Sequence, residues 1–240
     1  MLRRRSLTRM AGAVTLALLS SLAVSTRGSA VAAVAADDDT RPNVLNIVLD
    51  DMRDDTLAQM AAYLPKTVNW FAPGAFFTNA DVSTPSCCPA RAAGMTGRYD
   101  HNNGMRHQAD IANLDLSTTV QHYLHQAGYQ TALVAKYLHE WALATPPPDF
   151  DKYTMWQSAA YQNPTANVQG KVQKVNGYAT TVTGNVAVSY LQSLIADPQK
   201  RKWYEYVAFH APHPDASGVA IPEAKYANAS AYQALRLKPA

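Results

Sequence analysis

The chain of 240 residues has only two cysteines, and they stand side by side at Cys87 and Cys88. Adjacent cysteines cannot close an ordinary structural loop, so the sequence lacks the spaced pairs of a disulfide framework. It also lacks a clear membrane span, because its apolar run Met10–Val24 has 15 residues and a span needs about 20. A packed core must therefore hold the fold, and the two neighbouring thiols need another explanation.

The N-terminal segment is typical of an export signal. Four arginines precede the apolar run, and "AVA" at Ala33–Ala35 fits a small-residue cleavage site. We therefore expect residues 1–36 to be a signal peptide, of the Sec type or, given Arg4-Arg5, the twin-arginine type. The mature protein is then secreted or periplasmic and is not held in a membrane. A buried or anchoring helix is the alternative for the run.

Residues 37–240 have no excess of positive charge. Residues 1–36 hold five of the 21 basic side chains and none of the 18 acidic ones, which leaves 16 basic against 18 acidic. This balance argues against a nucleic-acid partner. Residues 37–240 suffice for one domain with a sizeable core.

Short apolar runs alternate with helical spacing along residues 37–240, which predicts an α/β fold with a largely parallel (mixed) sheet flanked by helices. The predicted strands are Asn43–Leu49, Gln130–Tyr137 and Trp203–Phe209, with Gly74–Val82 as a further strand or extended segment. The short apolar run Asn43–Leu49 predicts a strand buried on both faces. The predicted helices cover residues 56–63, 118–126 and 178–195, and one more follows Cys87 and ends at Gly97. Tyr153–Gly177 is polar, and we expect it to be irregular.

Asp50 and Asp51 stand where the first predicted strand ends. Ligands bind at that edge of open α/β sheets. Two ionised neighbours repel each other unless a cation lies between them, and oxygen ligands favour calcium or magnesium over zinc. The alternative is a solvated strand end that leads into a helix cap.

The segment around the two cysteines predicts a helix start. Ser86 or Thr84 can cap the helix, and Pro89 suits its first turn. Cys87 and Arg91 then lie about one turn apart near free backbone amides, which can hold an oxyanion and lower the pKa of a thiol. A small buried cysteine beside a tight helix is the alternative.

The sequence "CCPARAAGMTGRY" resembles the C-x-P-[SA]-R signature of the type I sulfatases. The segments "PNVLNIVLDD", "GYQTALVAKYLHEW" and "APHP" follow the family order, so the resemblance covers residues 42 to about 214. It is greatest to the arylsulfatase and N-acetylglucosamine-6-sulfatase branch. It implies an alkaline-phosphatase/sulfatase-like fold in which residues 37–240 are the N-terminal part of a catalytic domain whose C-terminal half is missing.

The resemblance implies a chemistry for the first cysteine. In this family a formylglycine-generating enzyme oxidises it to formylglycine, whose hydrate attacks the sulfur of a sulfate ester. The implied substrate is a sulfated small molecule or glycan. The implied metal is Ca²⁺, with Mg²⁺ as an option. Carried over by position, Asp50 and Asp51 match metal ligands, Cys87 matches the nucleophile and a further metal ligand, and Arg91 matches the residue that holds the aldehyde hydrate.

The same comparison assigns the remaining site residues. Lys136 matches a lysine that contacts sulfate, and His213 matches the histidine that binds sulfate and assists the leaving group. His139 is a further candidate for substrate binding, although its spacing from Lys136 departs from the family pattern. His210 is expected to support the strand end by packing, and Cys88 to be an ordinary thiol.

Three alternatives remain at the level of sequence. A phosphodiesterase or phosphonate monoester hydrolase of the same superfamily uses the same fold. A non-catalytic fragment that binds sulfated glycans would keep Cys87 unmodified, and an unstable fragment would not fold at all. Because the family's second pair of metal ligands lies downstream of "APHP" and has no counterpart here, we expect this chain alone to be weakly active or inactive.

Overall fold

The computed structural model describes residues 39–53, 57–156 and 160–229. The chain divides into two units, Met1–Asp39 and Thr40–Ala240, and the described fold belongs to the second. The predicted signal peptide, residues 1–36, lies outside the described residues. None of the helices in the described ranges has both the length and the apolar character that crossing a membrane requires.

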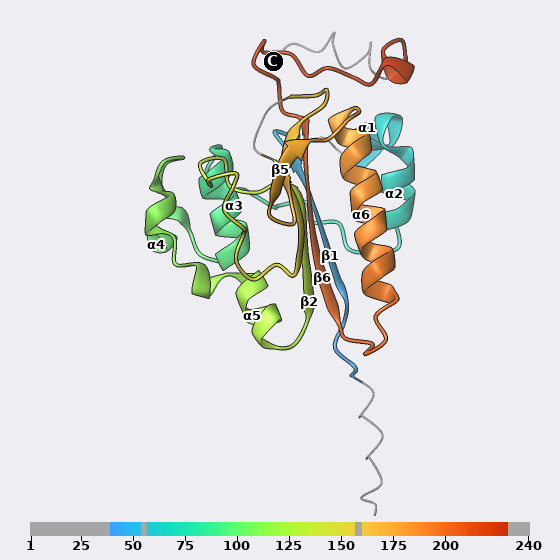
Figure 1. Ribbon diagram of the computed structural model, residues 1–240. Helices are drawn as coiled ribbons and strands as arrows, with labels where there is room; N and C mark the ends of the chain where they lie inside the picture. The colour runs from blue at the N-terminus through green and yellow to red at the C-terminus, as the bar shows by residue number, and fades with distance from the viewer. Residues whose placement is uncertain (1–38, 54–56, 157–159, 230–240) are drawn as a thin grey trace, which may run out of the picture. The chain divides into compact units, whose positions relative to one another are not determined.

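A six-stranded sheet forms the centre of the second unit, in the order β1-β6-β2-β3-β4-β5 (Figure 1). The first four strands in this order run parallel, and β4 and β5 are antiparallel additions. The prediction of a largely parallel, mixed sheet is confirmed. The strand bounds are Val44–Asp50 (β1), Gln130–Lys136 (β2), Lys152–Trp156 (β3), Thr165–Val168 (β4), Lys171–Lys174 (β5) and Trp203–Pro212 (β6).

Helices cover both faces of the sheet: α1, α2 and α6 lie on one face, and α3, α4 and α5 on the other (Figure 1). The α-helices span Leu57–Tyr63 (α1), Pro65–Phe71 (α2), Cys87–Thr96 (α3), Asp100–Asn103 (α4), Val120–Gln126 (α5) and Ala179–Ile195 (α6). Three short 3-10 helices cover Asp110–Asn113, Leu116–Thr118 and Ala224–Tyr226. The predicted helices are confirmed, and Gly97 ends α3 with a φ of 64°, which glycine adopts without strain.

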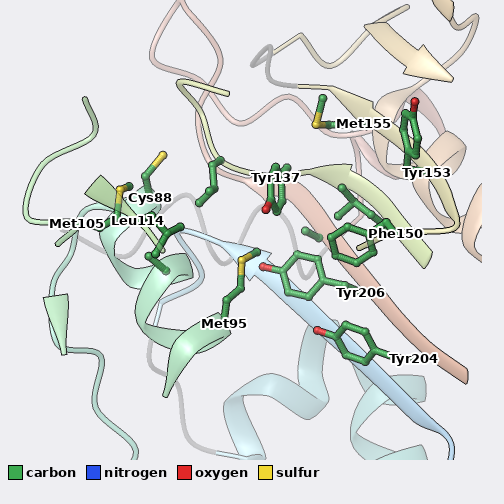
Figure 2. Packing of buried hydrophobic residues seen from close by; sticks show 14 of the residues in the cluster. Cys88, Met95, Met105, Leu114, Tyr137, Phe150, Tyr153, Met155, Tyr204 and Tyr206 are labelled. Atoms are coloured by element: carbon green, nitrogen blue, oxygen red, sulfur yellow. The ribbon is translucent and has the colours of Figure 1, made fainter. Parts of the chain in front are cut away.

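Two buried clusters hold the layers together, and β2 contributes to both. Leu133 belongs to the cluster on the α3–α5 side, together with Met95 and Tyr206 (Figure 2). Its neighbour Val134 belongs to the cluster that packs against α6. Successive strand residues point to opposite faces of the sheet. Because a cluster covers each face of β2, all seven of its residues are buried.

The edge strand β1 corrects one prediction. Asn43–Leu49 was expected to be buried on both faces, but Leu45 and Ile47 are 44% and 45% exposed. Val44 and Val48 face the other way and pack against the core. Within the described residues β1 pairs with β6 alone, so it is an edge strand, and its exposed Leu45 and Ile47 show that one of its faces is only partly covered.

The structure decides two further predictions about elements. Gly74–Val82 was expected to be a strand or an extended segment, and the strand is excluded, because the segment pairs with no strand of the described part and Phe77 is 77% exposed. Tyr153–Gly177 is not irregular, since it contains most of β3 and all of β4 and β5. The turn between β4 and β5 is formed by Gln169 and Gly170, both with positive φ. That geometry is typical of a tight hairpin.

Candidate active site

The predicted site residues lie on several elements that end close together. Asp50 is the last residue of β1, Lys136 is the last residue of β2, and His210 lies near the end of β6. These strands are neighbours and run parallel, so their carboxyl ends meet at one edge of the sheet. Helix α3 starts at Cys87 and contributes Arg91 to the same edge.

Asp50 is the centre of a buried ion cluster. Arg91 Nη2 donates to Asp50 Oδ1 at 3.2 Å, and Lys136 Nζ contacts Asp50 Oδ2. Burial by itself raises the pKa of Asp50, but the charges of Arg91 and Lys136 outweigh it and hold that pKa below the usual value. The carboxylate is therefore ionised and paired with two cations.

Arg91 ties three strands to α3. It is 5% exposed, and besides Asp50 its guanidinium donates to the Lys136 carbonyl at 2.9 Å and to Tyr206 Oη at 3.3 Å. Burial lowers the pKa of Arg91, but Tyr206 and Asp50 together raise it by more, so the net shift is upward. Arg91 thus stays charged and links the ends of β1 and β2 to Tyr206 in the middle of β6.

The two cysteines have different surroundings. Cys87 is half-buried, whereas Cys88 is fully buried in the core and its Sγ accepts the His139 backbone N–H at 2.9 Å. A hydrogen bond from Cys88 and a further one from Gln108 lower the pKa of Cys87 to about 5 against the effect of burial. The same bond and burial raise the pKa of Cys88. Cys88 is thus a packed thiol that also supports its neighbour.

Two histidines face the two aspartates, His210 near the end of β6 and His213 directly after it. His213 Nε2 lies 3.6 Å from Asp51 Oδ2, and His210 Nδ1 lies 3.8 Å from Asp50 Oδ2. His213 Nδ1 lies 2.6 Å from the Pro214 carbonyl and must donate to it, which leaves Nε2 without a hydrogen when the ring is neutral.

The imidazole of His210 is 5% exposed, and neither of its nitrogens has a hydrogen-bond partner within the described ranges. Burial and then the charge of Lys136 lower the pKa of His210 to about 4, so its ring is neutral at physiological pH. It lies beside His213, with ring centroids 4.8 Å apart. His210 was expected to serve in packing alone, and its unpartnered nitrogens now place a polar group at the centre of the site.

The donors at this edge fit a divalent cation in kind but not in number. One ligand atom each from Asp50, His210 and His213 lies within 4.8 Å of the others, and Asp51 adds an exposed carboxylate beside His213. Carboxylate oxygens suit Ca²⁺ or Mg²⁺, but calcium takes about six to eight oxygens. The two aspartates by themselves offer fewer oxygen ligands than that, and their role as metal ligands stays a prediction.

The candidate His139 and one further histidine, His101, lie at exposed positions. The His139 side chain is 52% exposed and its ring faces Glu140 at 3.9 Å. The His101 side chain is 59% exposed and stacks on Tyr99. The structure brings neither imidazole into the cluster around Asp50, so the proposed substrate contact of His139 stays a prediction.

Two contacts at the site were missed from the sequence. Gln108 touches both cysteines, and Tyr206 accepts from Arg91. Gln108 lies in a loop 21 residues after Cys87, where no spacing rule links the two. Tyr206 could have been singled out as a polar aromatic inside a buried strand, since its hydroxyl needs a partner.

Comparisons with known proteins place these residues in a family context. The family described as Sulfatase matches residues 42–234. The chain is 29% identical over 164 residues to N-acetylglucosamine-6-O-sulfatase of Bacteroides thetaiotaomicron, covering 65% of this chain and 28% of that protein. It is 28% identical over 186 residues to the extracellular sulfatase SULF-1 homolog of Drosophila melanogaster, covering 72% and 16%.

A solved structure of a protein in complex with its substrate D-glucosamine-2-N,6-O-disulfate is similar in fold, with a TM-score of 0.61 and 26% sequence identity. That similarity covers 72% of this chain and 35% of the solved one. The chain thus spans less than a third of the length of either curated relative named above. The mixed sheet flanked by helices is that of the alkaline-phosphatase-like sulfatases.

Proposed function

The chain belongs to the sulfatase family, and on that premise we propose that it serves the hydrolysis of sulfuric esters through a formylglycine made from Cys87. The observation that carries the proposal is the cluster at the sheet edge, where Asp50 lies between Arg91 and Lys136. Both cations act electrostatically on Asp50, and Lys136 acts on Cys87 as well. A nucleophile beside fixed positive charges suits attack on an anionic ester.

The chain's own residues have separate tasks in this proposal. Arg91 holds the aldehyde hydrate, and Lys136 contacts sulfate oxygens and stabilises the charge that grows on them. Once made, formylglycine supplies a hydrated aldehyde, with one hydroxyl for attack on sulfur and a second for release of sulfate. His213 holds its Nδ1 hydrogen on the Pro214 carbonyl, so Nε2 is the atom that takes up a proton to form the imidazolium and then gives it to the leaving alcohol.

The proposed cation site consists of Asp50 and Asp51, with residue 87 as a further ligand after conversion. A divalent ion, Ca²⁺ or Mg²⁺, supplies positive charge toward the sulfate oxygens. Since the described chain offers two carboxylates of the roughly six to eight oxygens that calcium takes, we expect the chain alone to bind the ion weakly and to be weakly active or inactive.

The proposed substrate is a sulfated sugar. The supporting observation is that the relatives include an N-acetylglucosamine-6-O-sulfatase and a structure with a disulfated glucosamine as its substrate. Simple aryl sulfates are a second substrate class of the branch. Export fits the same picture, because a relative is an extracellular sulfatase, and we propose that residues 1–36 direct it.

The test is expression of the chain in a host that contains the formylglycine-generating enzyme, followed by intact mass and sulfate release from glucosamine 6-sulfate and an aryl sulfate. We expect residue 87 to be converted, Cys87→Ala to remove the mass change, and Cys88→Ala to keep it. An unaltered thiol at position 87 in such a host would falsify the proposal. Faster hydrolysis of phosphate or phosphonate esters would assign the site to that chemistry instead.

A further inference from the structure

A single side-chain amide contacts both cysteines. Gln108 Nε2 donates to Cys87 Sγ at 3.0 Å, and Gln108 Oε1 accepts the Cys88 backbone N–H at 3.1 Å. The Cys87 thiol can also donate to the same Oε1, at 3.4 Å. Gln108 therefore has a bond for either protonation state of residue 87, as donor to the thiolate and as acceptor from the thiol.

Gln108 caps a backbone N–H group at the start of helix α3. Ser86 is the N-cap residue, but its side chain makes no capping bond. The first backbone N–H groups of a helix need partners from outside it, and Gln108 Oε1 takes the one of Cys88. The amide is thereby held at one end by the main chain while its other end faces the reactive side chain.

We propose that Gln108 is a positioning residue for residue 87, which it holds at the start of α3 beside Asp50 and Lys136. Its consequence for catalysis rests on the proposed function, whereas the contact with the thiol does not. An amide carries both a donor and an acceptor, so it suits sulfur before conversion and hydroxyl oxygen after it. A residue that only capped α3 would support the helix without affecting the side chain at position 87.

The experiment uses the full chain from a host without the converting enzyme, so that residue 87 stays a thiol. The rate of alkylation by iodoacetamide is followed from acid to mildly alkaline pH, and peptide mass spectrometry separates modification of Cys87 from that of Cys88. The reactive species is the thiolate, so the midpoint of the profile reports ionisation of Cys87. Thermal unfolding is measured on the same samples.

Two variants at position 108 test different parts of the contact. Gln108→Leu removes the hydrogen bonds to both cysteines. We expect the midpoint of the alkylation profile to rise by about one pH unit, which means about tenfold less thiolate on the acid side. Gln108→Glu keeps the shape and the acceptor for Cys88 but replaces the donor with a negative charge, so its midpoint should rise further. Gln126→Leu, at an exposed position at the end of α5, is the control and should match the wild type.

The outcomes separate the alternatives. A Gln108→Glu profile equal to the wild-type profile overturns the proposal, whatever the leucine variant does. A lower unfolding temperature for Gln108→Leu with an unchanged midpoint assigns Gln108 to capping alone and also overturns it. If residue 87 stays a thiol in a host that contains the converting enzyme, the proposed function fails, while a shifted midpoint still supports this contact.

Discussion

The central strand β2 and the edge strand β1 both end in the ion cluster, but they are supported very differently. All seven residues of β2 are buried between β6 and β3. In β1, Leu45 and Ile47 are nearly half exposed. The cluster thus joins Lys136 from the best-packed strand to Asp50 from a strand covered on one face. A site built in this way depends on the bonds that cross from one strand to the other.

Arg91 makes several of these bonds between strands. It contacts the Asp50 carboxylate, the Lys136 carbonyl and the Tyr206 hydroxyl. These groups belong to three strands, whereas Arg91 itself comes from α3. One buried guanidinium therefore links the edge strand to the centre of the sheet, in addition to the sheet's own hydrogen bonds.

The largest expected effect follows from removing that guanidinium. Arg91→Met leaves Asp50 buried with one cation less, and breaking a buried pair in this way costs about 3–5 kcal/mol of unfolding free energy. Urea unfolding of the full chain measures the loss. Arg201→Met is the control, since the Arg201 guanidinium is half-exposed where it pairs with Asp197, and loss of an exposed pair should change stability little.

The double variant Asp50→Asn with Arg91→Met sharpens the result. Because it removes the charge that Arg91 neutralises, we expect it to lose less stability than the sum of the two single variants. Additive losses, or an Arg91→Met variant as stable as the Arg201→Met control, would show that the guanidinium does not join edge and centre.

The next effect compares the two strands directly. Leu133→Ala in β2 removes a fully buried side chain and should cost about 2–5 kcal/mol. Ile47→Ala in β1 removes one that is 45% exposed, and we expect a loss of less than about 1 kcal/mol. Both are read from urea unfolding under the same conditions. Equal losses would mean that the exposed face of β1 is covered in solution, by a second copy or another partner.

The smallest effect concerns Glu205 on β6, the strand between β1 and β2. Its carboxyl is fully buried, and neither oxygen has a hydrogen-bond partner within the described ranges. Burial raises the pKa of Glu205 from 4.5 to about 7. Since the unfolded chain releases this proton at lower pH than the folded one, the contribution of Glu205 is fully present below pH 4.5 and falls as the pH rises toward 7.

Glu205→Gln removes that dependence. The amide has a similar shape and no charge to bury, so we expect the variant to exceed the wild type by about 2–3 kcal/mol at pH 8 and to differ little at pH near 4. Chemical unfolding at a series of pH values checks this, with each variant measured beside the wild type. A constant difference across the series would contradict the raised pKa.

The parts of the fold that were predicted correctly have strong local signals. Gln130–Tyr137 is a continuous apolar run, and residues 178–195 show helical spacing, so each predicted its element. Gly74–Val82 and Asn43–Leu49 misled because an aromatic or apolar run does not reveal whether a neighbouring strand or layer covers it. Strands β3 to β5 were missed because each has only four or five residues. The pairing of β4 with β5 also depends on a tight turn at Gln169 and Gly170.

The site residues also divide into those that the sequence predicted and those that it did not. Asp50, Arg91 and Lys136 were named from motif and resemblance, and the structure brings them together within hydrogen-bond reach. The contacts of Gln108 and Tyr206 escaped notice because they join segments 21 and 115 residues from their partners. No local pattern encodes a contact of that separation.

The order of residues alone determined the alternation of strands and helices, the helix that starts at Cys87 and the sulfatase resemblance, since each arises from neighbours within a few residues. Tertiary structure decided which thiol is buried, how Asp50 is shared between Arg91 and Lys136, and that His210 stands at the site with unpartnered nitrogens among the described residues. The physical reason is that burial and charge pairing are properties of a site in space, formed when strands distant in the chain come to lie side by side.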